Sequence, residues 1–218
     1  MKSQKVSEPE IRNELDAAVS ALHARRGLLI VVSAPSGTGK TTVCERLLQM
    51  MPEVKRSVSL TTRPRRPDEK NGEHYYFVSK NAFLDERARG RLAEWAEVHG
   101  HLYGTPRDAL EKRMRAGNDT VLVIDVHGAH SIRQAYHEAV LVFLLPPSWD
   151  ELEKRLRKRG PAPANQIALR LRNAAAEFGC YPNYDYVVVN DNIDKAASTL
   201  QAILIAERHR VNRLKPKQ

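Results

Sequence analysis

The segment "GLLIVVSAPSGTGKTTV", residues 27–43, constrains the fold more than any other stretch of this chain. An apolar run at 28–32 leads into a loop of small residues, and Gly-Lys-Thr then opens a helical pattern. Gly37 and Gly39 allow the loop to curl so that successive backbone N–H groups and the helix N-terminus face a polyphosphate. The order of strand, loop and helix therefore predicts an α/β domain with a phosphate site at this loop.

The loop and the first turn of its helix supply the residues expected to contact ATP. Lys40 adds a mobile positive charge and is expected to be catalytic, and the Thr41 hydroxyl is the expected ligand of Mg²⁺. A glycine turn before an ordinary core helix is the alternative, which the apolar run before Gly-Lys-Thr disfavours. Ala34 stands where this motif has its first glycine. The expected ATP contacts are Ala34, Pro35, Ser36, Gly37, Thr38, Gly39, Lys40 and Thr41.

Short apolar runs alternate with helical patterns along much of the chain. This alternation predicts a parallel sheet covered by helices on both faces. A length of 218 residues suits one such domain with a small insertion. The expected strands are 28–33, 120–125, 139–145 and 186–189, and the expected helices are 40–50, 128–137, 149–158 and about 192–213.

Two segments interrupt the alternation. Residues 57–103 contain short strand-like pieces, "HYYFV" and "RLAEWAEV" among them, and predict a small inserted β-rich lobe. Residues 158–166, "KRGPAPANQ", are rich in Gly and Pro between two helical stretches, which is typical of a mobile lid.

An amphipathic helix is expected ahead of the first strand, up to about residue 25. Ile11, Leu15, Ala18 and Leu22 recur at helical spacing, so we expect this helix to pack against the domain or a second subunit. Carboxylates interrupt residues 8–16, which excludes a secretory signal.

The composition indicates which kinds of partner the protein binds and in which cellular compartment it lies. The net charge of +9 indicates anionic partners, among which composition alone cannot choose nucleic acid, acidic lipid or nucleotide. Cys44 and Cys180 have no metal-ligand spacing, and the apolar runs are too short to span a bilayer. We therefore predict a reduced chain in the cytoplasm.

A cationic cluster lies in "SVSLTTRPRRPDEKNGEHYYFVS", residues 57–79. Basic runs usually form a solvated surface. Here a phosphate-binding loop lies upstream, and an arginine guanidinium meets phosphate oxygens as a planar fork that a tyrosine hydroxyl can supplement. The cluster, with Arg63, Arg65 and Arg66 followed by Tyr75 and Tyr76, thus suits a second phosphate, such as that of a nucleoside monophosphate.

At this point the chain resembles the guanylate kinase family, from about residue 27 to its C-terminus. The resemblance is carried by "SAPSGTGKTT", "SVSLTTRPRR", "NGEHYYFVS", "EWAEVHGHLYGT", "VLVIDVHGA", "LPPSWDELEKRLRKRG" and "YDYVVVND". It implies a P-loop kinase that transfers the γ-phosphoryl group of Mg-ATP to GMP, and also to dGMP, in purine nucleotide metabolism.

The resemblance also implies roles for individual residues. The residues implied to bind the GMP phosphate are Arg63, Arg66, Tyr75 and Tyr103. Those implied to contact guanine are Ser59, Glu94, Thr105 and Asp125. The lid arginines implied to close over the transferring phosphoryl group are Arg155, Arg159 and Arg170. Asn190 is implied to lie on the adenine side of the site. For Arg65 and Tyr76 a solvated or packing role is expected. The implied organisation is a helical extension at 1–26, a kinase domain at 27–213 with a GMP lobe at 57–105 and a lid at 158–170, and a basic tail at 214–218.

The chemistry of two carboxylates agrees with these roles. Glu94 can accept hydrogen bonds from the N1–H and N2–H₂ donors of guanine, although without the resemblance a surface glutamate is the better interpretation. Asp125 is expected at a strand end, where it can order Mg²⁺-bound water or the base, or cap the next helix.

The chain departs from the family pattern in three places. These are Val123, His127 and the lid, which has no acidic residues.

The prediction is thus a GMP kinase whose partners are ATP and GMP, with no nucleic acid and no membrane, and for which a homodimer is one arrangement. The rivals are a non-catalytic module of the same fold, a nucleic-acid-binding protein, and a kinase for another small phosphorylated acceptor. Lys40 and Thr41 disfavour the first rival. The separate positions of the arginines disfavour the second.

Overall fold

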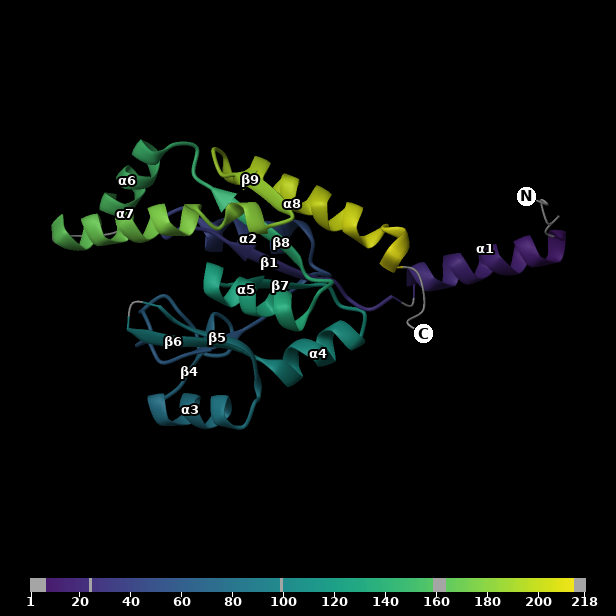
Figure 1. Ribbon diagram of the computed structural model, residues 1–218, viewed down its shortest axis with the longest axis horizontal. Coiled ribbons are helices and arrows are strands. Elements are labelled where there is room, and N and C mark those ends of the chain that lie inside the picture. The colour runs from purple at the N-terminus through teal and green to yellow at the C-terminus, as the bar shows by residue number, and fades with distance from the viewer. Residues whose placement is uncertain (1–6, 24, 99, 159–163, 214–218) are drawn as a thin grey trace.

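A five-stranded parallel sheet forms the centre of the computed structural model, which describes residues 7–23, 25–98, 100–158 and 164–213. The strand order β2-β7-β1-β8-β9 puts the strand before the phosphate-binding loop in the middle (Figure 1). All four neighbouring pairs are parallel, which confirms the predicted α/β class. The strands are β1 (Leu29–Ser33), β2 (Lys55–Arg56), β7 (Thr120–Val123), β8 (Val140–Leu145) and β9 (Tyr186–Val189).

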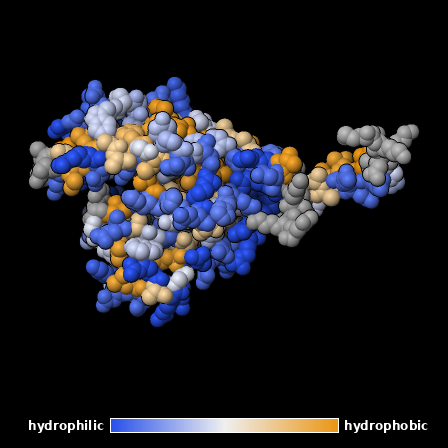
Figure 2. All heavy atoms as spheres, in the orientation of Figure 1, coloured by the Kyte–Doolittle hydropathy of each residue, from blue (hydrophilic) through white to orange (hydrophobic). Residues whose placement is uncertain are grey.

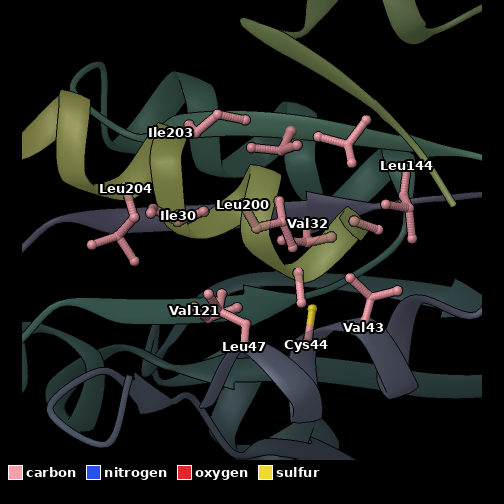
Figure 3. Packing of buried hydrophobic residues seen from close by; sticks show 14 of the residues in the cluster. Ile30, Val32, Val43, Cys44, Leu47, Val121, Leu144, Leu200, Ile203 and Leu204 are labelled. Carbon is pink, nitrogen blue, oxygen red and sulfur yellow. The ribbon is translucent and has the colours of Figure 1, made fainter. Parts of the chain in front are cut away.

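Helices cover both faces of this sheet. Alternate residues of β1 point to opposite sides, as strand geometry requires. Ile30 and Val32 enter a cluster with α2 (Lys40–Met50) and α8 (Ile193–Arg208), shown in Figure 3. Leu29 and Val31 enter another with α4 (Arg107–Arg115) and α5 (Val126–Ala135). The fully apolar run at 28–32 is therefore explained by burial on both faces.

A second sheet forms the predicted β-rich lobe. Its strands are β3 (Ser59–Thr61), β4 (Tyr75–Phe77), β5 (Leu92–Val98) and β6 (His101–Pro106), in the order β4-β3-β6-β5. Helix α3 (Lys80–Ala88) was not predicted; it begins after the N-cap Ser79 and closes the lobe with Phe83. Helix α4, which joins the lobe to β7, was not predicted either.

The lid region contains two packed helices, α6 (Trp149–Lys158) and α7 (Ala164–Phe178). They meet through Leu152, Leu156 and Ala174, all buried. Residues 159–163, and with them Arg159, lie outside the described residues. A 3₁₀ turn, η1 (Tyr181–Asn183), then leads into β9.

The two ends of the chain differ in part from expectation. The N-terminal helix α1 (Glu8–His23) projects away from the body, whereas packing against the domain was one expectation (Figure 1). The C-terminal helix was predicted to reach residue 213 but ends at Arg208. Arg210 and Arg213 turn back to the buried Glu207, and Val211–Arg213 form the 3₁₀ turn η2. In the described part of the chain, no helix combines the length and apolarity that crossing a bilayer requires.

Candidate active site

The phosphate-binding loop, residues 34–39, connects the buried strand β1 to the N-terminus of α2. Gly37 and Gly39 have φ of 95° and 91°, a region that favours glycine. A Cβ would lie 2.8 Å from a side-chain carbon of Leu156 at Gly37, and 2.6 Å from Asn190 Nδ2 at Gly39. Both glycines are thus required by conformation and by space, and Ala34 fits as a buried residue at the loop's start.

Three side chains fix this loop to the neighbouring strands. Lys40 Nζ donates to the Ile124 carbonyl at 2.7 Å, which holds the ammonium at the carboxyl end of β7. Asn190 is buried, and its amide donates to the Thr38 carbonyl at 2.7 Å. Arg155 donates from its two Nη atoms to the carbonyls of Thr38 and Asn190, each at 3.3 Å. Asn190, expected on the adenine side, thus also supports the loop.

Glu94 is the buried carboxyl at the centre of the lobe. Thr105 Oγ1 donates to Glu94 Oε1 at 2.6 Å, and Ser59 Oγ lies 3.5 Å from Thr105 Oγ1. Burial raises the pKa of Glu94 to about 7, against the hydrogen bond from Thr105, which lowers it. Gly128 of α5 makes room for this group, since a Cβ there would lie 2.7 Å from Glu94 Oε2. Three of the four residues predicted to read guanine, Ser59, Glu94 and Thr105, therefore form one hydrogen-bonded group.

The predicted phosphate-binding residues lie beside it. Arg63 Nε donates to the Tyr103 hydroxyl at 3.2 Å, and the Arg63 guanidinium carbon lies 5.5 Å from the Tyr75 ring centroid. The Tyr75 and Tyr103 rings meet edge to face at 5.9 Å. Arg66 is exposed. Three of the four predicted side chains are thus in mutual contact.

Glu69, a residue not singled out from the sequence, holds the guanidinium of Arg63. Its carboxylate accepts from Arg63 Nη1 and Nη2, and from the backbone N–H of Arg66. The hydrogen bond from Arg63 lowers the pKa of Glu69, so the carboxylate is ionised at neutral pH. The fork of Arg63 is pinned by the protein and is not a free surface charge.

One cavity of about 220 Å³ joins the loop to the lobe. Thr41 borders it from the loop side, Glu94 from the lobe, and Asp125 from the end of β7. Asp125 is the N-cap of α5, with Oδ1 accepting from the Gly128 N–H at 2.8 Å, so it also has the capping role that the sequence allowed. Glu177 of α7, another residue missed from sequence, borders the same cavity, and burial raises its pKa.

Of the three lid arginines, the structure describes Arg155 and Arg170 but not Arg159. Arg155 contacts the loop as described above, and Arg170 is half-buried on α7. Arg157 and Lys158, at the end of α6, are exposed. Arg65 donates to the Glu69 carbonyl and Tyr76 is exposed, in line with the packing and solvated roles expected of them.

The oxygen atoms at the cavity suit Mg²⁺ better than a soft or tightly caged metal. Thr41, Asp125 and Glu177 all border it. In the described ranges no group of three or more His, Cys, Asp or Glu is arranged to hold a metal ion. Mg²⁺ in phosphoryl-transfer sites takes one or two protein oxygens and completes its shell with substrate phosphate and water, so these residues fit it.

Known proteins resemble this chain over most of its length. The guanylate kinase family model matches residues 26–207. The chain is 47% identical over 192 residues to a guanylate kinase of Desulfitobacterium hafniense (strain Y51), a match that covers 88% of this chain and 96% of that protein. It is 49% identical over 191 residues to a guanylate kinase of Rhizobium meliloti (strain 1021), covering 87% of each. The crystal structure of guanylate kinase from Anaplasma phagocytophilum superposes with a TM-score of 0.74 at 37% identity, covering 87% of this chain and 90% of that one.

Proposed function

The chain belongs to the guanylate kinase family, whose members are ATP-dependent nucleoside monophosphate kinases, and on that premise we propose how its residues transfer a phosphoryl group from ATP to GMP. The observation that carries the proposal is the single cavity that joins the phosphate-binding loop to Glu94. Donor phosphate and acceptor base would thus occupy opposite ends of one space.

The ATP end is formed by the loop from Ala34 to Thr41. Backbone N–H groups and the N-terminus of α2 bind the polyphosphate, and Lys40 neutralises charge on the transferring group. Asn190, just after β9, supports the loop, and in this proposal it lies on the adenine side. Thr41 would hold Mg²⁺, with Asp125 and Glu177 accepting hydrogen bonds from its water, and the bound ion would neutralise phosphate charge.

The GMP end is formed by the lobe. Arg63, Arg66, Tyr75 and Tyr103 bind the phosphate, because guanidinium N–H groups and phenol hydroxyls donate to its oxygens, in Arg63 alongside the bonds from its two Nη atoms to Glu69. Ionised Glu94 accepts from guanine N1–H and N2–H₂. The hydroxyls of Ser59 and Thr105, together with Asp125, complete the base site.

In the reaction an oxygen of the GMP phosphate attacks the γ-phosphorus of ATP. A new P–O bond forms, the bond from that phosphorus to the β,γ-bridging oxygen breaks, and GDP and ADP result. The protein supplies position and positive charge and forms no covalent intermediate. Arg155, Arg159 and Arg170 stabilise the transferring group, and closure of α6 and α7 excludes the water that would otherwise hydrolyse ATP.

An ADP-release assay with GMP, dGMP, AMP, CMP and UMP tests this function. Release with GMP, at least about 10³-fold faster in kcat/KM than with AMP, is expected from a site that hydrogen-bonds the base. A non-catalytic module would release no ADP with any acceptor. A kinase for another acceptor would prefer a nucleotide other than GMP.

The organisation of the chain is part of the proposal. The helical extension at 1–26 lies outside the matched family segment except for residue 26, and it takes no part in transfer. The kinase unit comprises residues 27–213 with a GMP lobe at 57–105 and a lid at 158–170. Its setting is the cytoplasm, with nucleotides rather than nucleic acid or membrane as partners.

A further inference from the structure

The N-terminal helix α1 presents an apolar stripe to solvent. Ile11, Leu15 and Val19 lie four residues apart and are 55%, 61% and 46% exposed. Figure 1 shows the helix extending from the body near the end of α8, and Figure 2 shows apolar residues on it in orange. This stripe is far from the cavity, and the family match begins only at residue 26.

A helix of this length is marginal by itself. Isolated helices of about 12–15 residues are barely stable in water, and most helices depend on packing of an apolar face. α1 has 16 residues, and every described side chain from Glu8 to Ser20 is exposed. A partner that covers the stripe is therefore needed to hold the helix.

The charges of α1 indicate what that partner carries. Residues 8–23 contain four carboxylates, at 8, 10, 14 and 16, against the one cation Arg12, while the whole chain is at +9. The acidic residues Glu8 and Glu10 lie in the first turn, at the far tip. A partner whose apolar surface covers the stripe should therefore carry basic residues where it meets the acidic N-terminal end of α1.

The base of the same helix offers such a surface. The Gly27 N–H donates to the Met114 carbonyl at the end of α4, and Asp119 binds both Arg25 and Arg208, so the chain leaving α1 runs between the ends of α4 and α8. The basic residues there are Lys112, Arg113 and Arg115 in the last turn of α4 and Arg210 after α8. Lys112 is exposed, whereas Arg113 donates to the Arg56 carbonyl and ion pairs join Arg115 to Glu111 and Arg210 to the buried Glu207. Ile205, near the end of α8, and Val211, in η2, are exposed.

We propose that α1 pairs with α1 of a second copy of this chain in an antiparallel, two-fold arrangement. With Leu15 on the two-fold axis, Ile11 faces Val19 of the partner subunit. A helix of 16 residues spans about 24 Å, so each acidic tip reaches the basic base of the other copy. A parallel pair would instead bring the two acidic tips together, which like charges disfavour.

Sedimentation velocity of the full chain over a range of concentrations tests the pairing. We expect a dimer that Leu15→Glu weakens by at least about 100-fold, because the substitution places two unpaired carboxylates at the centre of the contact. Ala17→Glu on the opposite side of the helix is the matched control and should leave the dimer intact. ADP release with GMP should be unchanged in both variants, which shows that they fold and keeps this test separate from that of the kinase function.

Disulfide trapping tests the orientation, in chains where Cys180 is replaced by Ser. Oxidation of a mixture of Ile11→Cys and Val19→Cys chains should give the mixed disulfide, identified by peptide mass. Disulfides formed mainly between two Ile11→Cys chains would mean a parallel pair and overturn the arrangement. A full chain that stays monomeric at every concentration would overturn the proposal, and so would a monomer that binds phosphatidylcholine vesicles through this stripe.

Discussion

Glu69 accepts hydrogen bonds from both terminal nitrogens of Arg63, at 2.7 Å from Nη2 and 3.0 Å from Nη1. The same carboxylate accepts from the Arg66 backbone N–H at 2.9 Å. Arg63 also directs Nε to the Tyr103 hydroxyl. One acidic residue thereby sets the direction of the arginine proposed to bind the GMP phosphate, so the site is organised before substrate arrives.

Glu69→Gln tests this orientation. The amide keeps the size but removes the charge and one acceptor, so Arg63 loses part of its anchoring, and we expect KM for GMP to rise about 10-fold with little change in kcat. Steady-state kinetics at saturating ATP measures the change. Glu73→Gln, at an exposed carboxylate that pairs with Lys70, is the control. An unchanged KM for GMP would show that Glu69 does not position the clamp.

The raised pKa of Glu94 predicts a pH dependence of GMP binding. Burial raises this pKa to about 7, whereas the proposed contact with guanine requires the ionised form. Below about pH 7 a proton must therefore leave Glu94 when GMP binds, so GMP affinity should fall by up to about 10-fold per pH unit on the acid side and level off above it. Calorimetry from pH 5.5 to 8 measures this. A flat profile would contradict the role, and Glu94→Gln should remove this dependence.

The central sheet could be predicted because its signals are local. The apolar run at 28–32, the two glycines of the loop and the Gly-Lys-Thr that opens α2 are contiguous in sequence. Helix α3 was missed because only Phe83 of its nine residues is buried, which leaves little apolar periodicity to detect. Strand β2 has only two residues, and its place beside β7 depends on a tertiary pairing.

The site was less completely predictable. The resemblance marks residues that touch nucleotide but not those that hold them in place. Glu69 lies in a polar loop and looks solvated in sequence, yet the fold of that loop buries it to 8% exposure against Arg63. Glu177 sits on a helix whose pattern cannot show which residue faces the phosphate-binding loop 140 positions earlier in the chain. Such contacts arise only from tertiary structure.

Lys40→Ala should separate catalysis from folding. The Lys40 ammonium donates to the Ile124 carbonyl at the cavity, where a positive charge stabilises developing phosphate charge. We expect kcat to fall by at least about 100-fold, with a melting temperature within about 4 °C of the parent. Lys55→Ala, at an exposed lysine, should retain the parent's kcat. Turnover of Lys40→Ala within a few-fold of the parent would remove Lys40 from the mechanism.

Arg155 and Arg157 form a matched pair on α6. Arg155 donates to the carbonyls of Thr38 and Asn190, whereas Arg157 is exposed and pairs with Glu153. We expect Arg155→Ala to lower kcat by more than about 10-fold, with a smaller effect on KM for GMP, because its charge acts on the transferring group. Arg157→Ala should stay within about two-fold, as exposed ion pairs contribute little. Equal losses in the two variants would show that Arg155 has no special part.

The choice of base is the last test, because the phosphate clamp would hold the phosphate of any nucleotide. Glu94 accepts one hydrogen bond from Thr105 and can accept two more from guanine, while AMP would place an acceptor nitrogen, adenine N1, against the same buried carboxylate. Glu94→Gln replaces an acceptor with a donor, so kcat/KM for GMP should fall by about 10- to 100-fold and discrimination against AMP should shrink with it. The ATP affinity should not change. Glu97→Gln, on the same strand but exposed, is the control. If Glu94→Gln kept both the parent's GMP activity and its rejection of AMP, base recognition would have to come from Asp125 or from the hydroxyls of Ser59 and Thr105.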